Sequence, residues 1–114
     1  MNIIIIGCGK TGSRLANALD ERGYDVAVVD SNKENFSMLS DDFSGLEVCG
    51  DVTDIDVLGN AGCESANMAF VVTGKDTVNV TVAQTLNIEF GLSEVYLRVL
   101  DPSREAVFRK FGLR

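Results

Sequence analysis

A run of four isoleucines followed by a glycine-rich turn constrains the fold of this chain more than any other feature. Residues 3–6 are β-branched and do not alternate with polar side chains, which is typical of a strand buried on both faces. Gly7, Gly9 and Gly12 follow at once in the pattern Gly-x-Gly-x-x-Gly, and a helical pattern covers residues 11–22. This order predicts the start of a parallel sheet that helices cover.

The rest of the chain alternates between short β-rich runs and helical patterns. The β-rich runs cover residues 24–29, 46–49, 68–72 and 95–100, and the helical patterns cover residues 32–39, 53–60, 76–90 and 102–111. Strict β-α alternation at this spacing predicts an α/β protein with a Rossmann-like, doubly wound parallel sheet. We expect about five to six strands in three layers, with helices on both faces of the sheet.

The longest helical pattern, residues 76–90, leads to two expectations about individual side chains. Asp76 is a residue type that caps helix N-termini, so we expect it to accept hydrogen bonds from the first turn of this helix. An apolar stripe at helical spacing predicts the face that packs on the sheet. The stripe consists of Val80, Ala83, Leu86 and Phe90.

The balance of charges and the absence of histidine narrow the functional classes. The 114-residue chain carries 17 Asp and Glu against 10 Lys and Arg, a net charge of -7, which argues against holding nucleic acid by its phosphates. It contains no histidine, which removes the commonest general base and the usual zinc sites. Its three cysteines form no Cys-x-x-Cys pair, which predicts reduced thiols in a cytosolic protein.

The glycine turn matches the fingerprint of dinucleotide-binding domains in its context as well as in its spacing. Gly7 allows the tight turn, Gly9 lets a pyrophosphate approach the backbone, and Gly12 lets helix and strand pack closely. The helix N-terminus then offers N–H groups and the positive end of its dipole to the phosphates. Asp30 follows the second β-rich run, where a carboxylate binds the ribose hydroxyls and repels a 2′-phosphate, which disfavours NADP. The alternative is a glycine-rich turn that merely connects strand to helix.

Five further residues each allow a functional and a plain structural interpretation. Lys10 could meet the terminal phosphates of a nucleotide or be a solvated loop lysine. Asp51 could lie beside the adenine or form an Asx turn. Arg98 could face the crevice, a second subunit or an exposed strand edge, and Asn79 could contact the crevice, a subunit interface or only solvent. Cys8 lies near a helix N-terminus, which would lower the pKa of its thiol, but a small filler is its more usual role and no function is assigned to the thiol.

Segments spread over the whole chain match the motifs of one protein family. The matching segments are Gly7-Cys8-Gly9-Lys10-Thr11-Gly12, Val28-Val29-Asp30, Gly50-Asp51-Val52-Thr53-Asp54, Ala61-Gly62, Thr73-Gly74-Lys75-Asp76 with Asn79, Leu97-Arg98, and Phe108-Arg109-Lys110-Phe111-Gly112. In these segments the chain resembles the RCK domain, also called KTN or TrkA-N. The segments after the third and fourth β-rich runs are more diagnostic than the glycine turn.

The resemblance implies a cytosolic regulatory subunit or domain that binds NAD(H) or an adenine nucleotide (ADP or ATP) and gates a potassium channel or transporter. It implies a homodimer or higher ring that is peripheral to the membrane through a membrane-embedded partner, and no enzymatic activity. It also implies phosphate binding by the glycine turn with Lys10 and Thr11, ribose binding by Asp30, and adenine contacts by Asp51 with Thr53. The complete predicted site consists of Gly7, Cys8, Gly9, Lys10, Thr11, Gly12, Asp30, Ser31, Asp51, Val52, Thr53, Thr73, Gly74 and Arg98.

We expect one domain over residues 1–114, equivalent to the N-terminal nucleotide-binding domain of the RCK family. Many members of that family continue into a second ligand-binding lobe, which this chain lacks, so it is expected to be either a trimmed chain or a natural one-lobe subunit. Two other functions stay open: the cofactor-binding half of an NAD-dependent oxidoreductase, and an interaction module that binds no nucleotide. Because the Rossmann unit takes up the whole of this sequence, we expect no room for a substrate pocket, which favours a regulatory role over a catalytic one.

Overall fold

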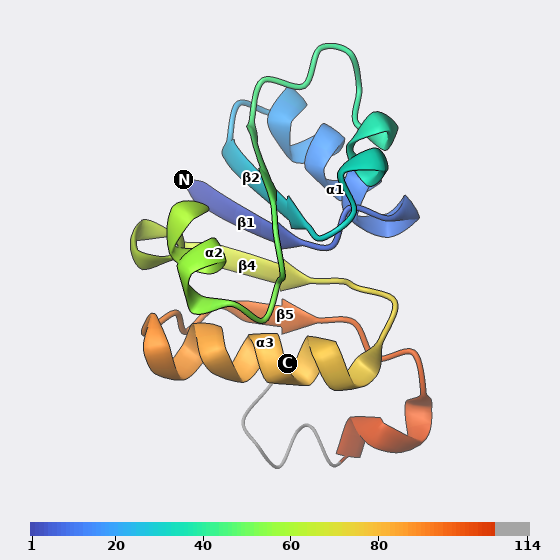
Figure 1. Cartoon of the computed structure of the whole chain (residues 1–114), viewed down its shortest axis with the longest axis vertical. Coiled ribbons are helices and arrows are strands. Elements are labelled where there is room, and N and C mark those ends of the chain that lie inside the picture. The colour runs from blue at the N-terminus through green and yellow to red at the C-terminus, as the bar shows by residue number, and fades with distance from the viewer. Residues whose placement is uncertain (107–114) are drawn as a thin grey trace.

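A five-stranded parallel sheet forms the centre of the computed structural model, which describes residues 1–106 (Figure 1). Its strand order is β3-β2-β1-β4-β5, as expected for a doubly wound, Rossmann-like fold. The strands are β1 (Asn2–Ile6), β2 (Asp25–Asp30), β3 (Leu46–Cys49), β4 (Met68–Val71) and β5 (Val95–Leu97). The predicted fold class is therefore confirmed.

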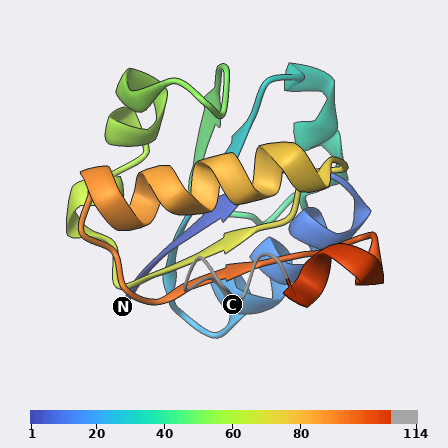
Figure 2. The same ribbon diagram turned by 90° about the horizontal axis from the view of Figure 1, so that it is seen from below.

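Helices cover both faces of the sheet and complete a three-layer structure. The α-helices are α1 (Lys10–Glu21), α2 (Ile55–Asn60) and α3 (Asp76–Glu89), and the 3-10 helices are η1 (Lys33–Met38), η2 (Cys63–Ser65) and η3 (Pro102–Arg104). On one face, α2 and α3 pack on the sheet through Leu58, Val82 and Leu86, all fully buried. Figure 2 shows α3 lying across the sheet. On the opposite face, α1 packs on the sheet through the buried Ala16, and Phe36 of η1 packs against the same apolar cluster.

The central strand β1 fixes the place where a ligand crevice is expected. Ile3 to Ile6 are at most 2% exposed, because alternate side chains enter the two cores. From β1 the chain winds outward through β2 to β3 and then returns to place β4 on the other side of β1. The strand order thus reverses between β1 and β4. A crevice opens at such a switch point, at the carboxyl ends of the strands.

Three sequence predictions need correction. The helical pattern over residues 32–39 gives only the short 3-10 helix η1 (Lys33–Met38), none of whose residues is buried, because these residues offer too little apolar surface to stabilise α-helical turns. The fifth strand ends at Leu97, because the backbone N–H groups of Leu100 and Asp101 bond away from the sheet, as described below. The helix predicted over residues 102–111 begins as η3, and residues 107–114 lie outside the described part of the chain. Within that described part, no helix is long and apolar enough to cross a bilayer.

Candidate nucleotide-binding site

A cleft of about 510 Å³ lies at the carboxyl ends of the strands, where the topology places the crevice. It is lined by Gly7, Gly9, Asp30, Ser31, Asn35, Asp51, Val52, Thr53, Val72, Thr73, Gly74, Lys75, Val78 and Arg98. Most of the residues predicted from the sequence are thus brought together around one space. Four predicted residues do not line it: Cys8, Lys10, Thr11 and Gly12. Four residues that line the cleft were not predicted from the sequence: Asn35, Val72, Lys75 and Val78. Lys75 belongs to a segment that matches a family motif.

The glycine turn between β1 and α1 is shaped by close backbone contacts. Gly7 has a φ of +103°, and its N–H donates to the Val29 carbonyl at 2.8 Å. A Cβ on Gly12 would lie 1.8 Å from the Gly7 carbonyl oxygen, so only glycine lets α1 approach the turn this closely. A Cβ on Gly9 would meet no atom within 4 Å, and Gly9 has an ordinary φ of -81°. Gly9 therefore leaves open space that a ligand can fill.

The N-terminus of α1 lies beside this space. The N–H of Ser13 makes the first bond of the helix, to the Gly9 carbonyl at 2.9 Å, so the N–H groups of residues 10–12 have no carbonyl of their own helix to bond. No side chain caps the helix and no acidic residue lies in its first turn. The exposed residues Lys10 and Thr11 begin the helix. This arrangement of N–H groups suits an anion.

Asp30, at the end of β2, is 9% exposed and holds the glycine turn in place. Its Oδ2 accepts hydrogen bonds from the Cys8 N–H at 2.7 Å and the Asn35 side-chain amide at 3.2 Å. Its Oδ1 accepts from the Asn32 N–H at 2.8 Å. The carboxylate therefore joins the glycine turn to the segment that follows β2, and Oδ1, which has only one donor, can still accept a ribose hydroxyl.

Asp51, just beyond β3, forms the Asx turn that was one of its two interpretations. Its Oδ1 accepts hydrogen bonds from the Thr53 N–H at 2.9 Å and the Thr53 hydroxyl at 2.7 Å. These bonds hold the pKa of Asp51 below its usual value, so the group is ionised at neutral pH. The turn also places Asp51 and Thr53 in the cleft wall, so the two interpretations are compatible.

Asn79 of α3 is completely buried and organises the loop between β4 and α3. Its Oδ1 accepts hydrogen bonds from the Thr73 N–H and hydroxyl, and its Nδ2 donates to the Thr73 and Arg98 carbonyls. All four bonding positions of the amide are filled. The solvent-exposed interpretation of Asn79 is therefore wrong, and its role is to join this loop to the end of β5.

Arg98, just beyond β5, turns its guanidinium into the cleft instead of toward an exposed edge. Nη1 donates to the Thr11 hydroxyl at 2.9 Å, and Nη2 donates to the Val72 and Thr73 carbonyls at 3.0 and 2.7 Å. Among residues 1–106, the buried Nε has no hydrogen-bond partner and no carboxylate pairs with the guanidinium. The cleft thus contains a partly buried positive charge whose partners are all uncharged.

The cysteine thiols have no place in the chemistry of the site. Burial raises the pKa of the Cys8 thiol to about 11, with smaller contributions from the negative charges of Asp30 and Glu47. The expectation that the nearby helix N-terminus lowers the pKa of Cys8 is therefore wrong. Burial likewise raises the pKa of Cys63 to about 12. Both thiols are packing residues, whereas Cys49 is exposed.

We expect one of the three cysteines to react fast with Ellman's reagent in the folded protein at pH 8, because only Cys49 is exposed. A pKa of about 11 instead of 9.0 lowers the thiolate population of Cys8 about 100-fold, and burial blocks access as well. All three thiols should react after denaturation. The Cys49→Ser variant should lose the fast phase, and equal rates for all three native thiols would contradict the packing described.

Comparison with known proteins gives a family and a set of structural relatives. The TrkA-N domain model matches residues 3–114. The Trk system potassium uptake protein TrkA of Streptomyces coelicolor is 38% identical over 113 residues, which cover 99% of this chain and 51% of that protein. The chain spans about half of the length of the first curated relatives it matches, and less of others.

Solved structures with a similar fold include domains of an inner membrane protein and of a channel. The TrkA-N domain of the Escherichia coli inner membrane protein ybaL has a TM-score of 0.86 at 15% identity, over 99% of this chain and 83% of that one. The GsuK channel bound to NAD has a TM-score of 0.79 at 21% identity, over 98% and 20% of the two chains. The Shewanella denitrificans Kef CTD in its AMP-bound form has a TM-score of 0.77 at 20% identity, over 100% and 70%. These structures share the fold, and the family match extends over nearly the whole sequence: the chain belongs to the TrkA-N domain family.

Proposed function

We propose that this chain is a cytoplasmic regulatory domain that binds NAD(H) or an adenine nucleotide and gates a potassium channel or transporter. The observation that carries the proposal is the cleft itself, in which a glycine turn, a helix N-terminus and the Arg98 guanidinium surround one open space. Diphosphates bind where N–H groups and a cation converge. NAD in the GsuK channel and AMP in the Kef domain support a ligand of this class.

We assign the two halves of the cleft to different parts of the ligand. The β2–β3 half contains Asp30 and Asp51 and would hold the ribose and the adenine. The glycine turn would hold the phosphates, and the β4–β5 half contains the cations Lys75 and Arg98, which suit a terminal phosphate. The carboxylate of Asp30 would repel a 2′-phosphate, so NADP is disfavoured.

The proposed role is regulatory, with a membrane-embedded potassium channel or transporter subunit as the partner. The TrkA relative is named a potassium uptake protein, which supports a role in potassium transport. We also propose that residues 1–114 act as the N-terminal nucleotide-binding domain of a homodimer or larger ring, peripheral to the membrane through that partner. The ligand would act by binding two conformations with different affinities, and not by undergoing a reaction.

The experiment that tests the proposal is a thermal-shift and calorimetry panel with NAD⁺, NADH, NADPH, ADP and ATP. A ligand at about 100 times its dissociation constant adds about 2.7 kcal/mol of stability, which raises the Tm measurably. We expect such a shift with at least one ligand that lacks a 2′-phosphate, and a smaller shift with NADPH. An unchanged Tm with all five would contradict nucleotide binding.

Gly9→Ala tests where the phosphates bind. The added methyl group fills the open space beside the helix N-terminus, so we expect affinity for the best ligand of the panel to fall at least about tenfold, or 1.4 kcal/mol. The fold should lose at most about 1 kcal/mol, because alanine is only a poorer N-cap than glycine. The matched control is Gly59→Ala on α2, which should leave affinity unchanged. Unaltered affinity in Gly9→Ala would mean that the phosphates bind elsewhere.

A further inference from the structure

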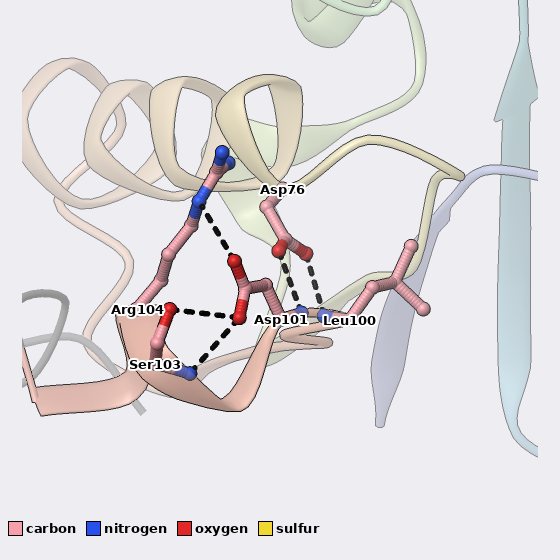
Figure 3. Close-up of polar contacts among 5 residues, drawn as sticks. All are labelled: Asp76, Leu100, Asp101, Ser103 and Arg104. Atoms are coloured by element: carbon pink, nitrogen blue, oxygen red, sulfur yellow. Dashed lines mark hydrogen bonds and ion pairs between the residues drawn. The ribbon is translucent and has the colours of Figure 1, made fainter.

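The four residues that follow β5, here called the 98–101 segment, are tied to the cleft at one end and to helix α3 at the other. The N–H of Arg98 donates to the Val71 carbonyl at 2.9 Å, which is the last bond of the segment to the sheet. The N–H groups of Leu100 and Asp101 then turn away from the sheet and donate to the two carboxylate oxygens of Asp76, at 2.6 and 2.9 Å (Figure 3). This turn is the reason that β5 ends at Leu97.

Asp76 is therefore a clamp for the 98–101 segment and not the helix cap that its sequence position suggests. The residue is 6% exposed, and each of its oxygens accepts from one backbone N–H of the segment. If the segment moved away, both oxygens would lose these donors, and a buried unpaired carboxylate is costly. Asp76 is also the first residue of α3, and the free N–H groups and the dipole at this helix N-terminus are alternative partners for its carboxylate.

The other end of the segment determines where the Arg98 guanidinium lies. The carbonyl of Arg98 accepts from Asn79 at 3.0 Å, and its side chain reaches back over the end of β4 to the Thr11 hydroxyl on α1. Arg98 and the clamped N–H of Leu100 are only two residues apart, so movement of the segment displaces the guanidinium. Asp76 itself does not line the cleft, and its side-chain partners are the Leu100 and Asp101 N–H groups of the segment.

We propose that nucleotide binding in the cleft and closure of the Asp76 clamp are coupled, so that occupancy of the site sets the position of the chain leaving β5. The proposal rests on the proposed function, because it requires ligand phosphates that contact Arg98. A phosphate gains this contact fully only when the clamp holds the 98–101 segment, so the ligand binds the clamped state more tightly and shifts the population toward it. By linkage, opening the clamp weakens ligand binding by the same factor.

Residue-resolved amide exchange, measured by NMR on the 114-residue chain with saturating ADP or NADH, tests the coupling. Shifts of the Gly9 and Gly12 resonances report binding, and the Leu92 amide, bonded to the Leu86 carbonyl at 3.1 Å at the far end of α3, reports global stabilisation. We expect exchange at Leu100 and Asp101 to slow at least about fivefold more than exchange at Leu92. If both slow only as much as Leu92, the coupling is overturned while nucleotide binding stands. If neither ligand shifts Gly9 or Gly12, both proposals fail.

Asp76→Asn provides the reciprocal test. The N–H groups of Leu100 and Asp101 donate to different oxygens of Asp76, and asparagine would replace one of these oxygens by an NH2 group that cannot accept. One N–H would then face another donor, so the clamp should open and the dissociation constant should rise at least about fivefold. The matched control is Asp42→Asn, which removes the same charge from an exposed loop and should leave affinity unchanged. Wild-type affinity in Asp76→Asn would overturn the coupling. If that variant does not fold, exchange in the wild type still decides the question.

Discussion

Replacing Gly12 by alanine is expected to destabilise the fold by about 3 kcal/mol, although alanine is the better helix former. The added Cβ would lie 1.8 Å from the Gly7 carbonyl oxygen and 2.9 Å from its carbon. Both are backbone atoms, so no side-chain rotation relieves the clash, and α1 must move away from β1. The gain in helix propensity, about 1 kcal/mol, is too small to compensate. Urea unfolding followed by circular dichroism measures the difference.

Gly59→Ala is the matched control for this prediction. Gly59 also lies in a helix, but a Cβ there meets no atom within 4 Å. The same substitution should therefore stabilise the protein by about 0.5–1 kcal/mol. Opposite signs at the two glycines would show that packing, and not helix propensity, requires glycine at position 12. A Gly12→Ala variant as stable as the wild type would contradict the close approach of α1 to the glycine turn.

Asn79→Ala is expected to cost about 3 kcal/mol, which is large for a single polar residue. The substitution removes four hydrogen bonds and leaves the polar groups of Thr73 and the Arg98 carbonyl without their buried partner. It also leaves a cavity where the amide packed, because Asn79 is 0% exposed. The midpoint of urea unfolding should fall accordingly.

Asn87→Ala on the same helix is the matched control, because it removes an asparagine that does not belong to the buried network. Asn87 is exposed and makes one hydrogen bond, to the Leu92 carbonyl at 3.2 Å. Its loss should cost no more than about 1 kcal/mol. Similar costs at the two positions would mean that the network around Asn79 does not hold the loop between β4 and α3 as described.

The fold and the first half of the site follow from local sequence patterns. The buried β1 strand and the spacing of Gly7, Gly9 and Gly12 are adjacent in the chain, so their meaning does not depend on distant residues. Asp30 could be placed at the cleft because parallel strands end at the same edge of a sheet. Local patterns and the rules of sheet topology were sufficient for these features.

The second half of the site depends on contacts between distant residues. Asp76 accepts from Leu100 and Asp101, 24 and 25 residues further along, and a helix-capping pattern gives no sign of such partners. The stripe predicted for α3 does pack on the core, with Ala83 and Leu86 fully buried and Val80 and Phe90 partly buried. It missed the fully buried Val82 and Asn79, and an amide is not counted as a core residue until its partners are known. For Cys8, proximity to a helix N-terminus is visible in the sequence, whereas the burial that dominates its pKa is not.

The contacts around the glycine turn have a consequence for the entropy of binding. The turn is held by the bond from Gly7 to Val29, by the bond from Cys8 to Asp30 and by the contact of Gly12 with Gly7. Its conformational freedom is therefore lost when the protein folds and not when a ligand arrives. Preorganised loops retain more of the interaction energy as affinity, and they bind without waiting for a slow rearrangement. The glycine turn would thus act as a rigid receptor for the proposed phosphates, and the proposed adjustment to the ligand lies in the 98–101 segment.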